Sequence, residues 1–357
     1  MNKRISRLLL IVLLFGFMAI LVQNEAFARP KYNEVSTVGL SKVIADKVTQ
    51  TMCNIGNWGF WVNYEGQTGH DPFTGSSGGF YLRGMMTSIY MDGIIWGAYL
   101  KDPSTGKVIA DTPRVGGIGY RIGTAPGWII GEGAGAQAVS AEDPRVRIFR
   151  IRSDWRTLTP SQVLQDASEL NNVPITGVTD AMTTAILEQY KADWKDWPVD
   201  LGAPYYDVNG NGQYDPVLDE NGYPDETKGD YPGIAQADQV VWLVVNDLNE
   251  AKVKAHSGSI PIGLELQITL WAYNQPNNTL GQIVFKRYKI INKSGMILDS
   301  MFVAQFSDPD IGDASDDLVG CDTTLSLHFA YNGSVTDVDY NKVNLPPAAA
   351  GYDFFQG

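Results

Sequence analysis

The sequence predicts a mainly β protein, an antiparallel β-sandwich-like fold with a two-helix insertion and a long calcium-loop connection. Three observations carry this prediction. Short aromatic and β-branched runs separated by Gly, Asp and Pro recur on both sides of the chain's middle, as in strands joined by turns. Residues 156–198 change to a helical period. The Asp- and Asn-rich stretch 207–215 then places oxygen-bearing side chains at alternate positions.

The N-terminus predicts export. Lys3, Arg4 and Arg7 precede the apolar run 8–22, and Ala26-Phe27-Ala28 offers a small-residue cleavage site, so residues 1–28 are expected to be a signal peptide. The run is shorter than a membrane-spanning helix needs, and no later segment is apolar for long enough, so no membrane span is expected after cleavage. The expected location is therefore secreted or at the cell surface.

Composition limits the classes of function. The 357 residues carry a formal net charge of −13, which disfavours nucleic acid and anionic membrane surfaces as partners because both require clustered Lys and Arg. Only Cys53 and Cys321 are present, so they either form one disulfide across a long loop or remain as two small hydrophobic side chains. The isolated histidines give no zinc spacing.

The first half of the chain is expected to begin with a leader, residues 29–52, containing a weakly helical patch at 41–51. A β-rich region follows at 53–155, with aromatic strands up to Tyr99. At its end, 145–152 alternates four arginines with apolar residues, the period of a strand with one buried face. Those arginines are expected to form a solvated strand face, with an anion site as the alternative.

The helical insertion, 156–198, is expected to hold two helices. Thr159, Pro160 and Gln162 supply an N-cap, a proline at the first position and a capping-box glutamine, starting a helix through about residue 170. A second helix is expected over 180–194, because Met182, Ile186, Tyr190 and Trp194 repeat every four residues. We interpret this apolar stripe as core.

The last region, 236–357, is expected to return to strands that pack with 53–155. The apolar run 239–245 is typical of a strand buried on both faces. Residues 264–273 alternate apolar side chains with polar and aromatic ones. Strands at 282–291 and 296–306, joined by the turn 292–295, are expected to form a hairpin, and 324–331 another strand. Phenylalanines at 354–355 would be exposed at a free end, so we expect a fragment of a longer chain with further domains.

A connection at 199–235 contains the clearest candidate site. Its loop resembles an EF-hand motif, but Leu218 stands where the bidentate Glu belongs and neither flank is expected to be helical. We therefore predict a weak Ca²⁺ site of the extracellular kind, with an Asn-Gly-rich turn that binds no metal as the alternative. The predicted ligands are Asp207, Asn209, Asn211, Gln213, Asp215 and Asp219.

A second acidic cluster follows the strand that ends near residue 306. So many carboxylates repel one another unless a cation or proton is shared, so we expect either a second calcium site or a solvated acidic loop. A glycosidase would need two such groups astride a sugar-binding cleft. The residues are Asp308, Asp310, Asp313, Asp316 and Asp317.

Other candidate motifs are weaker. Trp271 and Tyr273 share a strand face and are possible glycan contacts, although packing beneath the helices is the favoured interpretation. The segment 75–79 matches G-x-S-x-G, but a nucleophile elbow needs a strand before it and a helix after it. No phosphate-binding glycine motif is present.

The chain resembles large secreted proteins of Bacteroidota and related bacteria that carry a C-terminal type IX secretion sorting domain. The resemblance lies in Asn57–Trp61, Gly69–Pro72, Asp207–Asp215, the Phe285–Ser294 strand and turn, and Ser307–Asp313. It implies export and little chemistry, and this sequence lacks a sorting domain. We therefore expect a secreted or cell-surface, calcium-stabilised structural or adhesion module without catalytic activity, meeting glycans or other surface proteins. The alternative is a carbohydrate-active protein that binds or hydrolyses glycans.

Overall fold

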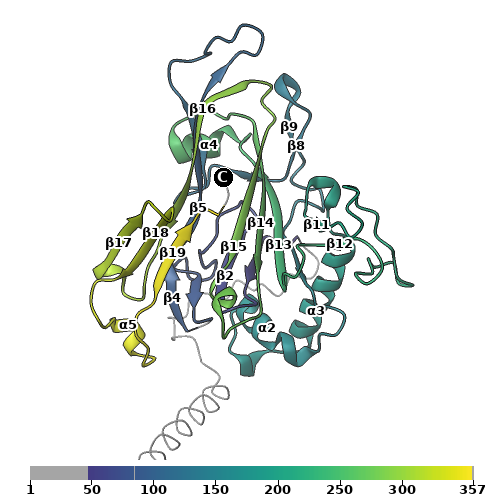
Figure 1. Cartoon of the computed structure of the whole chain (residues 1–357), viewed down its shortest axis with the longest axis vertical. Coiled ribbons are helices and arrows are strands. Elements are labelled where there is room, and N and C mark those ends of the chain that lie inside the picture. The colour runs from purple at the N-terminus through teal and green to yellow at the C-terminus, as the bar shows by residue number, and fades with distance from the viewer. Residues whose placement is uncertain (1–46, 84, 356–357) are drawn as a thin grey trace, which may run out of the picture.

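The computed structural model describes residues 47–83 and 85–355 (Figure 1). The expected signal peptide, 1–28, and most of the expected leader, 29–52, lie outside the described residues. None of the helices in the described part of the chain is long and apolar enough to cross a membrane. The chain is mainly β, in several antiparallel sheets, as the sequence predicts.

Two sheets face each other across the main core. Sheet I joins two sets of strands through bridges from Thr68 to Val62 and to Asp92. Its sets run β1-β2-β3-β4 and β16-β5-β6: β1 (Gln50–Cys53), β2 (Trp58–Asn63), β3 (Gly79–Tyr81), β4 (Met86–Ile89), β16 (Ile297–Asp308), β5 (Met91–Lys101) and β6 (Arg114–Gly117). Sheet II runs β10 (Phe149–Arg152), β13 (Gln239–Asn246), β14 (Leu264–Ala272) and β15 (Phe285–Asn292), with β7 (Ala125–Pro126) also on β13.

The β13 strand confirms the prediction of a strand buried on both faces, since all eight of its residues are buried. Val241, Leu243 and Val245 point into the core between the sheets. Alternate residues, including Trp242, belong to a second hydrophobic cluster on the other side of sheet II. This alternation follows from the two-residue period of a strand.

The core between the sheets draws on both β-rich regions of the sequence. Sheet II contributes one face of β14, and sheet I contributes one face of β5. These residues are Leu264, Leu266, Ile268 and Leu270 with Ile94, Trp96, Ala98 and Leu100. On the opposite face of β14, Glu265, Gln267 and Thr269 are polar but also buried.

The two predicted helices are present and cover the outer face of sheet II (Figure 1). The predicted capping box at Thr159 and Gln162 forms, but it opens a 3-10 turn, Pro160–Val163, that leads into α2 (Leu164–Asn171). Thr179 caps α3 (Asp180–Lys195). Tyr190 and Trp194 of the predicted stripe are buried in the second hydrophobic cluster.

Smaller elements complete the chain. A third sheet, at the left of Figure 1, pairs β17 (Asp317–Asp322), β18 (Leu327–Asn332) and β19 (Ala349–Asp353), with α5 (Val338–Asn341) beside it. Two short ladders join β8 (Ile129–Ile130) to β9 (Gln137–Ala138), and β11 (Tyr205–Tyr206) to β12 (Tyr231–Pro232). The short α4 (Glu250–Ser257) was not predicted, because Val253 is its only buried residue and no apolar stripe marks it.

Two local predictions are wrong. The turn at 292–295 does not close a hairpin, because β15 pairs with β14 and β16 pairs with β5, so this turn carries the chain from sheet II to sheet I. The partners of these strands are remote in sequence, and short links alone do not reveal them. The end of the expected helical patch is instead strand β1, because Thr51, Met52 and Cys53 bury their side chains against β2.

Candidate functional site

The candidate calcium loop lies between β11 and β12, which pair to bring its two ends together near α3 (Figure 1). The intervening connection, 207–230, is largely exposed. Gly210 and Gly212 adopt φ of 73° and 75°, the left-handed region that glycine enters without steric cost, so the chain winds tightly there. This winding brings the side chains of the loop close to its own backbone.

Asp207 lies at the start of the winding and accepts three backbone hydrogen bonds. Its Oδ1 accepts from the N–H groups of Gly210 at 2.6 Å and Asn211 at 3.2 Å, and its Oδ2 accepts from Gly212 at 2.7 Å. Each carboxylate oxygen has more than one lone pair, so these bonds leave capacity for a cation. Asp207 therefore shapes the loop and remains able to accept further contacts.

Asn209, Asn211 and Asp215 converge on the same loop. The side-chain amides of Asn209 and Asn211 both donate to Asp215, at 3.2 and 3.0 Å. Their own oxygens accept backbone N–H groups: Asn209 from Asn211 at 2.9 Å, and Asn211 from Gln213 at 2.7 Å. Three of the six predicted ligands, Asn209, Asn211 and Asp215, thus contact one another. The exposed Gln213 takes part here through its backbone.

Asp230 is a residue that sequence reasoning missed. It is buried, and its carboxylate accepts the N–H groups of Val208 at 2.9 Å and Asp215 at 3.1 Å, which braces the two ends of the loop. Burial alone would raise the pKa of Asp230, but the backbone hydrogen bonds outweigh it and lower that pKa. The only sequence signal was an acid immediately before Tyr231-Pro232.

Asp219 is engaged elsewhere. Its Oδ1 accepts the backbone N–H groups of Asn221 and Tyr223, and its Oδ2 pairs with Arg156 at 2.6 Å. Hydrogen bonds from Tyr223 and Arg156 lower its pKa, although partial burial opposes them. Asp219 therefore anchors the connection to the start of the helical insertion rather than completing the loop.

The donor set of the loop suits a hard cation. Asp207 and Asp215 supply carboxylate oxygens, and Asn209 and Asn211 supply amide oxygens, the ligand types that calcium prefers. Across residues 47–83 and 85–355, no group of three or more Asp, Glu, His or Cys side chains has metal-binding geometry. A cation here would depend on two carboxylates together with amide, backbone or water oxygens.

The second acidic cluster is spread over several partners. Asp308 accepts from Tyr120, Asp310 accepts from Ser77 at 3.1 Å, and Asp313 caps the 3-10 turn Ala314–Asp316. Asp316 ends that turn, and Asp317 begins β17.

Asp317 is crowded by other carboxylates of this cluster. Its Oδ2 accepts the N–H of Ile311 at 2.8 Å, whereas its buried Oδ1 has no hydrogen-bond partner among the described residues. Burial and the charges of Asp310 and Asp316 raise the pKa of Asp317, although the Ile311 bond opposes this. The cluster therefore crowds negative charge, and a second calcium site remains a prediction.

Trp271 lies near the end of β14 and Tyr273 directly after that strand, and both side chains are half-buried. Trp271 stacks on Phe285 at 5.3 Å between ring centroids, and Tyr273 meets the same ring edge-on at 5.9 Å. Both pack against the hydrophobic cluster beneath the helices. One ring face of Trp271 is therefore occupied by Phe285.

The prediction that the four arginines of 145–152 form a solvated strand face is wrong. Arg150 and Arg152 are buried, because α2 and α3 cover the strand that carries them. Carboxylates on these helices neutralise the charge of the arginines. The alternative, an anion site, is also disfavoured because each arginine has a carboxylate partner within the chain. The pairs are Arg145–Asp200, Arg147–Asp193, Arg150–Asp166 and Arg152–Asp154.

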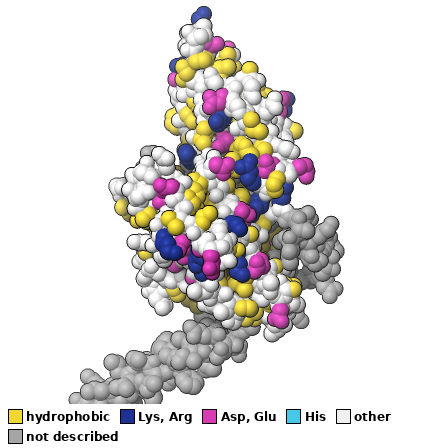
Figure 2. All heavy atoms as spheres, turned by 90° about the vertical axis from the view of Figure 1, so that its right-hand side faces the viewer, with side chains coloured by type: hydrophobic (Ala, Val, Ile, Leu, Met, Phe, Trp, Pro, Cys, Tyr) yellow, Lys and Arg dark blue, Asp and Glu magenta, His cyan; other side chains and the backbone are white. Residues whose placement is uncertain are grey.

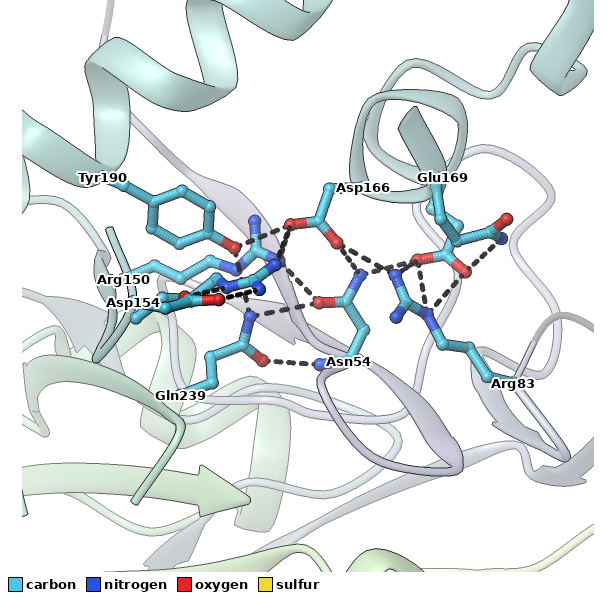
Figure 3. Close-up of polar contacts among 10 residues, drawn as sticks. Asn54, Arg83, Arg150, Asp154, Asp166, Glu169, Tyr190 and Gln239 are labelled. Atoms are coloured by element: carbon cyan, nitrogen blue, oxygen red, sulfur yellow. Dashed lines mark hydrogen bonds and ion pairs between the residues drawn. The ribbon is translucent and has the colours of Figure 1, made fainter. Parts of the chain in front are cut away.

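Arg150 belongs to a buried polar network beneath the helices (Figure 3). Asp166 of α2 accepts from Arg150 at 3.0 Å, Tyr190 at 2.7 Å, Arg83 at 2.9 Å and Asn54 at 3.0 Å. The arginines lower its pKa to about 2 even though burial alone would raise it. This network fastens the insertion to both sheets.

Glu169, one turn later, extends the network. It accepts from Asn54 at 2.6 Å and from Arg83 at 3.1 Å (Figure 3). Gln239 on β13 connects to Asn54 and Tyr190, at 3.2 Å in each case. With its carboxylates paired to arginines inside the fold, we interpret the network as structural.

Comparison with known proteins gives no family. No family model, curated protein or solved structure matches this chain. The resemblance to secreted Bacteroidota proteins therefore stays a prediction, and function must be argued from the residues themselves.

The two cysteines and the G-x-S-x-G segment lie in surroundings that indicate no reaction. Cys53 is buried and Cys321 is exposed, and neither forms a disulfide. Burial raises the pKa of Cys53 to about 12, so it is an unreactive thiol. The G-x-S-x-G segment leads into strand β3 rather than a helix, and Ser77 donates to Asp310.

Proposed function

We propose that this chain is a secreted or cell-surface structural or adhesion module, stabilised by calcium and without catalytic activity. The observation that carries the proposal is the convergence of Asp207, Asn209, Asn211 and Asp215 in a loop whose ends are braced by Asp230. A cation there would stiffen a long connection, because it would replace amide contacts on Asp215 with direct coordination.

The surroundings of the loop fit an ion with a structural role. The loop is exposed, and its anchors, Asp219 and Asp230, bind backbone N–H groups and Arg156. Two neutral amide ligands predict weak affinity, in the range of about 10⁻⁴ to 10⁻³ M that extracellular modules show.

Calorimetric titration of the purified chain with calcium tests the site. We expect saturable heat that Asp207→Ala abolishes, because this side chain supplies both charge and three backbone contacts. Glu220→Ala, an exposed acid in the same connection, is the matched control and should leave the heat unchanged. Heat that is absent from the unaltered chain, or equal in both variants, counts against the proposal.

The proposed partners are other surface proteins, glycans or further domains of the same chain, and not nucleic acid. On the face shown in Figure 2, basic and acidic side chains are interspersed rather than gathered in a basic patch. Exposed apolar residues such as Phe302, 77 % exposed, and Val319, 72 % exposed, offer contacts to a neighbouring protein.

Carbohydrate activity is the second candidate. It is favoured by one observation, the stacked and half-exposed pair of Trp271 and Phe285 beside Tyr273. A glycan-array screen tests it, with Trp271→Ala as the variant. Binding that this substitution removes would support a glycan site, and an array without specific binding would reject it.

A further inference from the structure

A lysine and an aspartate meet inside the core between sheets I and II. Asp92 lies on β5 of sheet I, and Lys286 lies on β15 of sheet II, 194 residues later in the chain. Asp92 is 0 % exposed, and the Lys286 side chain is 13 % exposed. Removing two opposite charges from water costs several kcal/mol each, so such a pair needs an explanation beyond stability.

The contact between the two groups is unusually close. Lys286 Nζ lies 2.5 Å from both Oδ1 and Oδ2 of Asp92. A nitrogen that is equally close to both oxygens of a planar carboxylate lies within about 3 Å of the carboxyl carbon, the separation of a near-attack arrangement. The reacting atoms of an amide bond are therefore already together.

The other polar groups hold the carboxylate in place. Tyr352 of β19 donates to Oδ2 at 3.1 Å, and the Thr68 hydroxyl donates to Oδ1. Lys286 Nζ also donates to Thr68 Oγ1 at 2.9 Å. The three strands that carry the lysine, the aspartate and the tyrosine lie close together at the centre of Figure 1. Both partners are thus oriented before any reaction.

The surroundings favour the uncharged form of the lysine. The Phe60 ring centroid lies 4.1 Å from Lys286 Nζ, and the buried Cys53 is close by. Burial lowers the pKa of Lys286, and attraction to Asp92 offsets this only in part. Burial and the negative charge of Asp92 raise the pKa of Tyr352, which therefore keeps its proton. A neutral amine is the nucleophilic form of lysine.

We propose that Lys286 Nζ and Asp92 Cγ join in an intramolecular isopeptide bond formed by the folded chain itself. One ammonium proton moves to the carboxylate, the nitrogen lone pair attacks Cγ, and the bond from Cγ to Oδ2 breaks. Two of the three ammonium protons leave with that oxygen as water, and the third stays on the new amide nitrogen. No oxidant or other reagent is required, and Tyr352 donates a hydrogen bond to the departing oxygen.

The product explains why these groups are buried. An amide carries no net charge, so the bond removes the desolvation penalty of the ion pair. It also ties sheet I to sheet II across the core and encloses the helical insertion in one covalent loop. Such a bond would serve a secreted structural module whose two cysteines are unpaired. The inference rests on β5, β15 and β19 and does not depend on calcium.

Mass spectrometry of the unaltered protein tests the inference. After denaturation and trypsin digestion, we expect the peptide that ends at Lys101 to be linked to the peptide that contains Lys286, with the pair lighter by one water. Trypsin should also fail to cleave after Lys286. Two separate linear peptides, neither of which has lost a water, together with cleavage after Lys286, would overturn the proposal.

Variants separate the bond from folding. Lys286→Arg should abolish the linked peptide, whereas Lys289→Arg, at an exposed lysine on the same strand, should retain it. Tyr352→Phe should slow the appearance of the link after refolding while leaving its final mass unchanged. A link that persists in Lys286→Arg would contradict the assignment. The tryptic peptide map of the unaltered chain decides whether the bond forms, even if a variant does not fold.

Discussion

The Asp166 carboxylate offers the sharpest test of how the helical insertion is held. Its pKa falls from 3.8 to about 2 in the folded chain, because Arg150 and Arg83 outweigh its burial. A shift of nearly two units corresponds to about 2 kcal/mol of stability. Since the folded pKa lies below the unfolded one, this contribution is full above about pH 4 and is lost as pH falls toward 2.

Removing the whole Asp166 carboxylate should lower the free energy of unfolding by more than the pKa shift accounts for. Asp166→Ala leaves the buried Arg150 and the Tyr190 hydroxyl without their acceptor, and breaking a buried pair in this way costs about 3 to 5 kcal/mol. Asp166→Asn keeps the shape but removes the charge, so it should lose at least about 2 kcal/mol at pH 7.

Urea unfolding at a series of pH values measures both variants. The difference between Asp166→Asn and the unaltered chain should shrink as the pH falls from 4 toward 2, because the unaltered carboxyl then becomes protonated. Glu188→Gln, at an exposed acid on α3, is the matched control and should change stability by less than about 0.5 kcal/mol. A pH-independent difference, or a loss below about 1 kcal/mol for Asp166→Ala, would refute the assigned role.

Two further predictions concern the packing on either side of sheet II. Burial raises the pKa of Asp193 to about 6, although Arg147 opposes the shift, so folding takes up a proton and stability should rise as pH falls from 7 toward 5. Thermal unfolding should show this rise, and Asp193→Asn should remove it; an unchanged profile in the variant would contradict the prediction. Leu266→Ala, in the core between the sheets, should cost about 2 to 5 kcal/mol in urea unfolding, and a loss below about 1 kcal/mol would mean that the site collapses without a cavity.

Much of the fold was predictable because its signals are local. The buried β13 strand, the capping box at Thr159 and the stripe that ends at Trp194 each follow from spacing within one element. The structure also places Asn209 and Asn211 against Asp215, as the alternate spacing of these side chains suggested, whereas calcium binding there stays a prediction. Short-range patterns thus identified the elements and the loop.

The rest depended on partners that are remote in sequence. A strand cannot show which neighbour it will pair with, so the β15–β16 turn looked like a hairpin. Arg150 looked solvent-facing because Asp166, which neutralises it, lies on a helix that follows. Asp230 and the pair of Asp92 and Lys286 carry no motif, since their meaning comes entirely from the chain that surrounds them.

Limited proteolysis with and without calcium tests the central claim, that an ion stiffens the exposed connection of a structural module. Cleavage sites would be mapped between Asp200 and Pro232, with the ion added or removed by a chelator. We predict that calcium slows cleavage there, that chelation restores it, and that Asp207→Ala abolishes the protection. Equal cleavage rates with calcium and with chelator in the unaltered chain would contradict the account.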